Sequence, residues 1–404
     1  MQIDIVESAS SDPAIAVSEL CAQIGDGTAD FAFVCADADL DAAALAAAGR
    51  SLPVTFLHGV TSCMGPMTAR SADPGQRATL AAFVIRDPEG DYGTGCQDLG
   101  DDPRQAAVRA TLSALAGAGR SGEVPDVVWL TATPGTEEQL IQGIQDVVGD
   151  GVPIIGGSAA DNDMSGRWYV FSAGGSSAEG VTVSVLFPST QVAFSFSNGL
   201  VPTAHRGTVT KARGRSLISI DDRPAGQVYA EWLADRVLPP GAADSCSMMP
   251  ERFALAPLGR RVSDLRGVPN YLQVQPRVTE PNDSLTLYGE VAEGEQLTLM
   301  TGDPRLLADR AGRVAARAVP FGIGRDMIAG ALMVYCGGCM LAARDRMDRI
   351  VNGTGAALGH APFLGLFSFG EQGPVLGAGN RHGNLMISCL VFTRSVSGII
   401  APAA

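Results

Sequence analysis

Val152-Pro153-Ile154-Ile155-Gly156-Gly157-Ser158-Ala159 combines a proline, an apolar run, glycines and a small hydroxyl residue. The same order of residue types recurs at 52–62 and at 361–371. Proline is tolerated at the first residue of a strand, and glycine lets the backbone turn sharply or approach a ligand. We therefore predict that each phrase is a buried strand that follows a helix and a turn and ends in a glycine loop. Packing alone is the alternative reason for the repetition.

Composition limits the kinds of partner that the chain can have. Its 404 residues are typical of two domains, and the 46 % of hydrophobic residues suffice for a large core. A formal net charge of −14 opposes contact with phosphate backbones, so we expect no nucleic-acid partner. The short basic stretch 211–215 is interpreted as a solvated turn. No apolar run reaches about 18 residues, which predicts no membrane insertion.

The expected location is the cytoplasm. Residues 1–8 lack a positively charged region followed by an apolar core, so they are not expected to act as a signal peptide. Eight cysteines are scattered along the chain without the spacing of a disulfide framework. Free buried thiols are therefore expected.

The predicted fold class is mixed α/β, that is α+β, with layered mixed sheets covered by helices. Apolar strand-like runs alternate with helical stretches at 103–117 and 136–148, whereas 168–220 predicts consecutive antiparallel hairpins. The second half repeats this style, with helices expected at 304–316 and 339–352. Such a mixture favours two pseudo-repeated domains, and Pro239-Pro240-Gly241 suggests a boundary between 1–238 and 239–404.

An ordered set of motifs resembles the FIST family (F-box and intracellular signal transduction). Four segments are similar to its N-terminal domain and three to its C-terminal domain. They are 59–65, 134–138, 152–161 and 209–229 for the first, and 291–295, 365–371 and 382–384 for the second. The resemblance extends from about residue 25 to 395 and assigns 1–238 to a FIST N-terminal-like domain and 239–404 to a FIST C-terminal-like domain.

The resemblance implies a role in signal transduction. FIST domains are associated with bacterial sensing of small ligands, and some members resemble haem proteins that respond to nitric oxide. No kinase or cyclase segment is recognisable, so a separate signalling protein would receive the output. Cys339 stands where the family tends to have Arg. A family ligand held by that Arg, for example a carboxylate, is therefore not expected here.

The glycine loops supply the predicted small-ligand site. Glycine N–H groups, hydroxyls, amides and carboxylates can hold a small polar molecule. The predicted ligand-binding residues are Thr61, Ser62, Gly156, Gly157, Ser158, Asp161, Asn162, Gly370, Glu371, His382 and Asn384. We expect the three loops to meet in one cleft between the two domains. Structural turns and a solvated loop carboxylate are the alternatives.

The sequence leaves the cofactor unknown, with haem as an alternative. A haem iron needs an imidazole that faces an apolar pocket, and His382 or His58 is the candidate. Cys336 and Cys339, separated by two glycines, form a candidate redox pair. Zinc would need two further ligands, so no metal site is predicted.

A third hypothesis is an enzyme that acts on a small polar metabolite. Asp161, Glu371 or Cys336 would carry its chemistry. The chain has no Gly-x-Ser-x-Gly nucleophile motif and no strong catalytic motif of another kind. We therefore favour a sensor that binds a small molecule over an enzyme.

Overall fold

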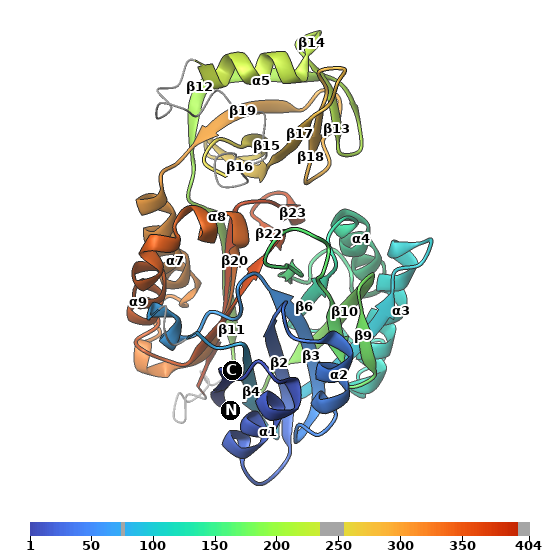
Figure 1. Cartoon of the computed structure of the whole chain (residues 1–404), viewed down its shortest axis with the longest axis vertical. Coiled ribbons are helices and arrows are strands. Elements are labelled where there is room, and N and C mark those ends of the chain that lie inside the picture. Colours follow the sequence, from blue (N-terminus) through green and yellow to red (C-terminus); the bar gives the residue numbers. More distant parts are fainter. Residues whose placement is uncertain (74–76, 235–253, 395–404) are drawn as a thin grey trace, which may run out of the picture.

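The computed structural model describes residues 1–73, 77–234 and 254–394. Figure 1 shows a lower body of β-sheets with helices on its outside, and an upper lobe that carries a further sheet. This arrangement confirms the expected mixed α/β class with layered mixed sheets covered by helices.

The lower body contains three sheets whose four-stranded cores share one arrangement. In each core two strands are parallel, a third is antiparallel to the first of them, and a fourth pairs with that third strand. In spatial order the cores are β1 (Gln2–Ser8), β4 (Leu80–Arg86), β2 (Ala29–Asp37) and β3 (Val54–Ser62); β5 (Asp91–Asp98), β10 (Gly180–Phe187), β6 (Val127–Ala132) and β7 (Ile154–Ser158); and β11 (Val192–Asn198), β24 (Met386–Thr393), β20 (Ile328–Cys336) and β21 (Phe363–Ser368). The body is thus built from three β-α-β-α-β-β units, named repeats 1, 2 and 3.

The helices support the same repetition. The first helix of every repeat begins with an Asp-Pro pair, and each Asp carboxylate accepts N–H groups of the first turn. These helices are α1 (Pro13–Ile24), α3 (Pro103–Gly117) and α7 (Pro304–Ala318). The second helices are α2 (Ala42–Gly49), α4 (Glu137–Val148) and, in repeat 3, α8 (Gly337–Ala342) followed by η4 (Arg344–Arg346) and α9 (Met347–Ala357).

Two of the three sheets are extended at one edge by the following repeat. Repeat 2 adds β8 (Val170–Ser172) and β9 (Gly175–Ser177) to β3, and repeat 3 adds β22 (Glu371–Val375) and β23 (Gly379–Gly383) to β7. Met67 of repeat 1 forms a bridge to Gly365 of β21 and closes the cycle. Every exposed edge beside a phrase strand is therefore covered by another part of the chain.

The inner faces of the three sheets share an apolar core. Phe33 of β2 meets Trp129 of β6 edge to face, with ring centroids 5.2 Å apart. Phe83 of β4 lies 5.6 Å from Phe392 of β24. All four side chains are fully buried. Aromatic pairs of this kind fix the sheets against one another in addition to the area that they bury.

The upper lobe is an insertion between β11 and α7 of repeat 3. Its strands are, in spatial order, β16 (Val268–Val274), β15 (Leu258–Leu265), β19 (Gln296–Thr301), β12 (Val201–Arg213), β13 (Ser216–Ile220), β18 (Leu285–Leu287) and β17 (Pro276–Thr279), with β14 (Arg223–Pro224) paired to β13. Helix α5 (Ala225–Ala234) covers this sheet through Val228 and Tyr229 (Figure 1).

Two local predictions were wrong. Within 168–220, β8 pairs with β9 and β12 with β13 as hairpins, but β10 and β11 pair with strands from distant parts of the chain. These two strands pair with distant strands rather than with their neighbours in sequence because they complete the buried sheets of repeats 2 and 3. The helix expected over 339–352 is interrupted at η4. The suggested boundary at 239–241 lies outside the described residues, and the division at residue 238 stays a prediction.

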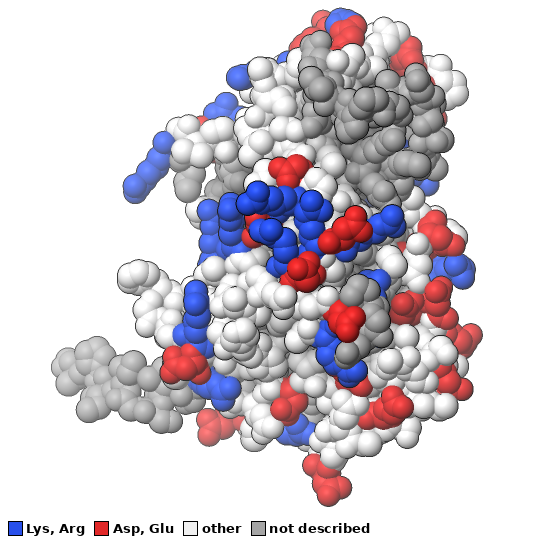
Figure 2. Space-filling model, turned by 60° about the vertical axis from the view of Figure 1, so that its left-hand side comes forward, with Lys and Arg blue, Asp and Glu red and all other residues white. Residues whose placement is uncertain are grey.

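Positive charge gathers on one face of this acidic chain. Figure 2 shows a band of Lys and Arg side chains on the face that carries α7 and α9, below the upper lobe. Helix α7 supplies Arg310, Arg313 and Arg317, whose charges interact, and η4 supplies Arg344 and Arg346. We call these five arginines the basic band. Among the helices of the described residues, none combines the length and the apolar character needed to cross a bilayer.

Candidate functional site

The carboxyl ends of β3, β7 and β21 meet at the centre of the lower body. Backbone hydrogen bonds join them directly across the three sheets. They run from Cys63 N to Phe367 O at 3.0 Å, from Ser158 N to Gly370 O at 2.7 Å, and from Ala160 N to Thr61 O at 3.1 Å. The three phrases of the sequence, more than 300 residues apart at their extremes, thus form one junction.

Three equivalent serines mark this junction. Ser62, Ser158 and Ser368 end their strands and lie in parallel register opposite Asp37, Ala132 and Cys336 respectively. All three serines are fully buried. Their hydroxyls donate to Gly65 O at 2.7 Å, to Glu137 Oε1 at 2.7 Å and to Glu371 Oε1 at 2.6 Å. Each serine therefore fastens the loop or carboxylate beside it.

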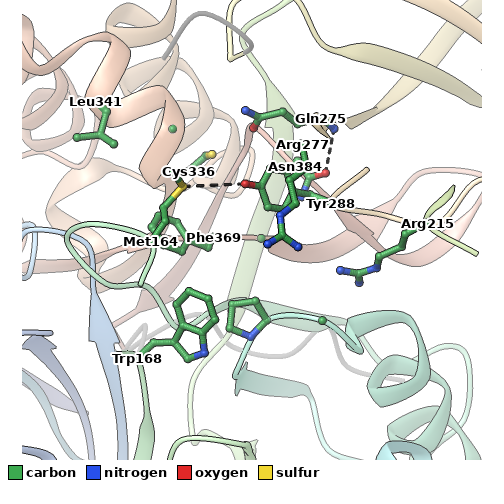
Figure 3. Close-up of a pocket in the computed structure, with 14 residues that line it drawn as sticks. Met164, Trp168, Arg215, Gln275, Arg277, Tyr288, Cys336, Leu341, Phe369 and Asn384 are labelled. Carbon is green, nitrogen blue, oxygen red and sulfur yellow. Dashed lines mark hydrogen bonds between the residues drawn. The ribbon is translucent and has the colours of Figure 1, made fainter. Parts of the chain in front are cut away.

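A cavity of about 260 Å³ lies beside the junction, between the lower body and the upper lobe (Figure 3). Ligands of open α/β sheets commonly bind beyond the carboxyl ends of parallel strands, and the loops after β6, β7, β20 and β21 line this cavity. The body contributes Pro134, Gly135, Met164, Trp168, Cys336, Gly338, Leu341, Phe369, Gly370 and Asn384. The lobe contributes Arg215, Gln275, Arg277 and Tyr288.

Aromatic rings form much of the wall. Trp168 and Phe369 meet edge to face, with ring centroids 6.0 Å apart. Figure 3 shows Trp168 and Tyr288 on opposite sides of the cavity. The Tyr288 hydroxyl donates to Met164 Sδ at 4.0 Å, a contact between lobe and body. A wall of this kind suits a flat molecule with an apolar body.

Arg277 brings an uncompensated positive charge to the cavity. Its guanidinium lies 5.9 Å from the Tyr288 ring centroid, and within the described residues no carboxylate pairs with it. The side chain is exposed to solvent. A guanidinium offers five N–H donors in a planar fork that matches a carboxylate.

Arg215 has a different environment, because two carboxylates hold it. Its guanidinium contacts Glu137 Oε2 at 2.6 Å and Glu138 Oε2 at 2.7 Å. Burial raises the pKa of Glu138, but His382 and Arg215 outweigh burial and lower that pKa to about 2. The pKa of Glu137 is lowered against the same burial by the same two partners. The lowered pKa values favour ionised carboxylates, and the two acids neutralise the positive charge of Arg215.

Cys336 ends β20 and its thiol lies in the wall of the cavity. The Cys339 thiol and the N–H groups of Cys339, Leu385 and Gly338 donate to its sulfur. The Cys339 contact is the largest effect; together the four contacts outweigh burial and lower the pKa of Cys336 to about 7. Burial and the neighbouring Cys336 hold the pKa of Glu371 well above its ordinary value. The two shifts thus run in the directions that favour a thiolate on Cys336 and a protonated carboxyl group on Glu371.

Family models match most of the chain. The model of the FIST N domain matches residues 30–223, and that of the FIST C domain matches residues 225–374. The chain belongs to the FIST family. FIST domains are signal-transduction sensor domains, so this FIST chain falls in that broad functional class. The expected resemblance is confirmed for both domains.

This FIST chain was also compared with curated proteins and with solved structures. No curated protein matches it. Among solved structures, a distant likeness is found to the crystal structure of cyanuric acid hydrolase from A. caulinodans, with 9 % identity and a TM-score of 0.37. The alignment covers 98 % of this chain and 99 % of that chain.

The structure divides the predicted ligand-binding residues of this FIST chain into two groups. Gly370, Asn384 and the candidate redox residue Cys336 line the cavity. The others support the junction around it: Thr61, Ser62, Gly156, Gly157, Ser158, Asp161, Asn162, Glu371 and His382. Glu371 is fully buried and accepts from Ser368 and Met386, so its loop carboxylate is not solvated.

Asp161 and Asn162 serve the protein's own backbone. Asp161 accepts the N–H groups of Met164, Gly166 and Arg167 at 2.6, 2.7 and 2.9 Å. Asn162 donates to Asp37 at 2.9 Å and accepts from the N–H of Met64. They shape the loop that carries Trp168 to the cavity, which is an indirect role.

Neither candidate haem ligand faces the cavity. Both ring nitrogens of His58 are hydrogen-bonded at 2.7 Å, to Ser184 and to Thr131, inside the core. His382 lies between Gln372 and the Tyr288 carbonyl, at 3.3 Å from each. An iron ligand would have to leave these partners, so the geometry gives the haem alternative no support.

Most residues of the cavity were missed by sequence reasoning, among them Trp168, Arg215, Arg277 and Tyr288. Arg215 belongs to the basic stretch that was interpreted as a solvated turn, yet only 22 % of its side chain is exposed. That interpretation was wrong for Arg215, because its acid partners lie more than 70 residues away. Local sequence carries no signal for such a contact.

Proposed function

We propose that this chain is a sensor that binds a small, flat, anionic molecule in the cavity between the upper lobe and the lower body. Arg277 is the observation that carries the proposal. It is a guanidinium without an acid partner in the described residues, at the edge of an aromatic-lined hollow. A carboxylate on the ligand would supply the missing partner through charge-assisted hydrogen bonds.

The other lining groups supply orientation and fit. Trp168, Tyr288 and Phe369 provide faces and edges for a planar ring. Gln275 and Asn384 lie at the same wall, where Asn384 Oδ1 accepts the Gln275 N–H at 3.1 Å (Figure 3). The volume of about 260 Å³ suits a molecule of metabolite size. Because Cys339 stands where the family tends to have Arg, a carboxylate ligand was not expected from the sequence. In this proposal Arg277 of β17 takes the place of that arginine.

The position of the cavity supports a sensing mechanism. Arg277 and Tyr288 belong to the lobe, whereas Trp168 and Phe369 belong to the body. A ligand that contacts both parts stabilises the arrangement in which they are close, and so shifts the population toward it. The differential affinity of the ligand for the two arrangements sets the size of that shift.

A separate signalling protein would detect the ligand-bound arrangement. Helix α8 lines the cavity through Gly338 and Leu341, and the chain continues directly into η4 of the basic band. A partner with an acidic surface fits Arg344 and Arg346 by charge. A cytoplasmic location agrees with the described cysteines, seven free thiols.

The test compares anion binding by the wild type and by Arg277→Gln. Native mass spectrometry of the purified protein would first identify any retained molecule, and thermal shifts with benzoate and other ring carboxylates would follow. Loss of a charge-assisted contact should weaken binding by about tenfold to a hundredfold. Arg266→Gln is the control, since Arg266 is an exposed arginine of the same lobe outside the cavity. Equal binding by wild type and Arg277→Gln, or no bound anion at all, contradicts the proposal.

A further inference from the structure

The Cys336–Cys339 pair has features that ligand binding does not require. The two thiols are hydrogen-bond partners, and Cys336 also lines the cavity. Small molecules that enter the cavity can therefore meet its sulfur, while Cys339 lies fully buried behind it. This is the placement of a nucleophilic thiol with a resolving thiol at its side.

The surroundings of the Cys336 sulfur are built for a negative charge. Backbone N–H groups of Gly338, Cys339 and Leu385 converge on it. Leu385 adopts a left-handed backbone with φ of 57°, which is uncommon for a residue with a branched side chain. This backbone conformation directs the Leu385 N–H toward the sulfur, as expected where the surrounding structure fixes a donor.

An acid stands next to the same sulfur. Glu371 is fully buried, accepts from Ser368 Oγ at 2.6 Å and from the Met386 N–H at 2.9 Å, and is a hydrogen-bond partner of Cys336. Burial and the neighbouring Cys336 raise the pKa of Glu371, which favours a protonated carboxyl group beside an ionised Cys336. A proton donor is thus in place for a group that leaves from the sulfur.

The other buried thiols differ in every respect. Cys35, Cys63 and Cys389 do not line the cavity, and burial raises the pKa of each of them. A buried cysteine of that kind is inert. Within the described residues, Cys336 is the one thiol that joins access, donors and a neighbouring thiol.

We propose that Cys336 and Cys339 form an oxidant-sensing site that hydrogen peroxide converts to a disulfide. The Cys336 thiolate attacks one peroxide oxygen, the O–O bond breaks, and the departing hydroxide takes the Glu371 proton and leaves as water. The Cys339 sulfur then attacks the sulfenic acid on Cys336, the S–O bond breaks, and a second water leaves with the Cys339 proton. Glu371 regains the proton that Cys336 released on ionising. Two thiols are oxidised and one peroxide is reduced to two waters.

The disulfide would alter the cavity wall. The Cys336 sulfur would lose its charge and the hydrogen bond from Cys339, both of which hold the first turn of α8. Gly338 of the same turn lines the cavity. The site therefore connects oxidation to the lobe–body cavity, but the oxidation itself needs no ligand and is independent of the function proposed above.

The test treats the reduced protein with a slight molar excess of hydrogen peroxide and measures its intact mass and a non-reducing peptide map. The wild type should lose two hydrogen masses, mapped to the 336–339 peptide. Cys339→Ser should stop at the sulfenic acid and give a dimedone adduct on Cys336. Cys336→Ser should show neither product, and Cys389→Ser, the control for a buried thiol, should react as the wild type does.

The role of Glu371 has its own measurement. Glu371→Gln keeps the size of the side chain but cannot give up a proton, so the disulfide should form at least about tenfold more slowly. Should Glu371→Gln fail to fold, the Cys339→Ser adduct still decides the proposal. Oxidation spread evenly over all cysteines, no mass loss in the wild type, or an unchanged reaction in Cys336→Ser would overturn it.

Discussion

Ser158 Oγ donates a hydrogen bond of 2.7 Å to Oε1 of Glu137, inside the core and beside the candidate site. Ser368, at the equivalent strand end of repeat 3, makes the same kind of bond to Glu371. Both carboxyl groups are almost fully buried. The junction serines thus position two acids with opposite protonation behaviour: Glu137 has a lowered pKa and Glu371 a raised one.

Arg215→Met should destabilise the protein by about 3 kcal/mol, because it leaves Glu137 as a buried charge without its cation. Urea unfolding at neutral pH measures this loss. Arg213→Met, an exposed position two residues away, is the control and should change stability by less than about 0.5 kcal/mol. Equal stability of the two variants would show that the ion pair contributes nothing.

The stability of the wild type should fall at acidic pH because of the same Arg215–Glu137–Glu138 network. The folded pKa of Glu138, about 2, lies below the ordinary value of 4.5. Its contribution to stability is therefore complete above about pH 4.5 and is lost as the pH falls toward 2. Glu138→Gln should flatten the pH dependence of the unfolding free energy in that window. Identical curves for both proteins would refute the assignment.

His58 should produce a second pH dependence at higher pH. Burial lowers its pKa to about 3, so it stays neutral in the folded state while the unfolded chain takes up a proton below its ordinary value of 6.5. Stability should fall by about 1.4 kcal/mol per pH unit as the pH drops below 6.5. His58→Gln should remove that slope, whereas the exposed His360→Asn should not. The measurement is urea unfolding between neutral and mildly acidic pH.

Gly156→Ala should abolish stable folding. An added Cβ would lie 1.7 Å from the Leu130 carbonyl oxygen, and β6 and β7 cannot separate without opening the core. A cost above about 4 kcal/mol is expected for such overlap. Gly151→Ala meets nothing within 4 Å and should leave the urea midpoint nearly unchanged. A soluble, normally stable Gly156→Ala protein would show that β7 is wrongly placed.

Asp161→Asn should loosen the loop that carries Trp168. Its Oδ2 accepts the N–H groups of Gly166 and Arg167, and an amide NH₂ there would face two donors. A loss of about 2 kcal/mol is expected, together with faster hydrogen exchange at both amides. Asp163→Asn changes an exposed carboxylate of the same loop and is the matched control. Unchanged exchange in Asp161→Asn would contradict this role.

Local patterns were sufficient for much of the fold. The phrases at 52–62, 152–159 and 361–371 contain β3, β7 and β21. A proline, an apolar run and a terminal glycine predict a strand and its ends from residues that are close in sequence. Helix starts followed the same logic, as at Asp102-Pro103 and Thr136. The mixed α/β class and the family follow from these features and are confirmed.

Long-range partners could not be predicted in the same way. Arg215 and Glu137 are far apart in sequence, and only the folded lobe brings them together. Arg277 lies on the edge strand β17, and the residue pattern of this strand does not indicate which of its faces meets the lower body. Asp161 and Glu371 were assigned to a ligand because their types suit one. Whether a carboxylate binds a ligand or the protein's own N–H groups depends on chain that is distant in sequence.

The threefold construction of the lower body has a consequence for how such a chain can diversify. Three corners of common design converge, and each combines a buried serine with close backbone contacts to its neighbours. The residue facing each serine differs: an acid at Asp37, a methyl at Ala132, a thiol at Cys336. Repetition thereby separates scaffold from chemistry, since one corner carries a reactive thiol while its two siblings have the same architecture without it.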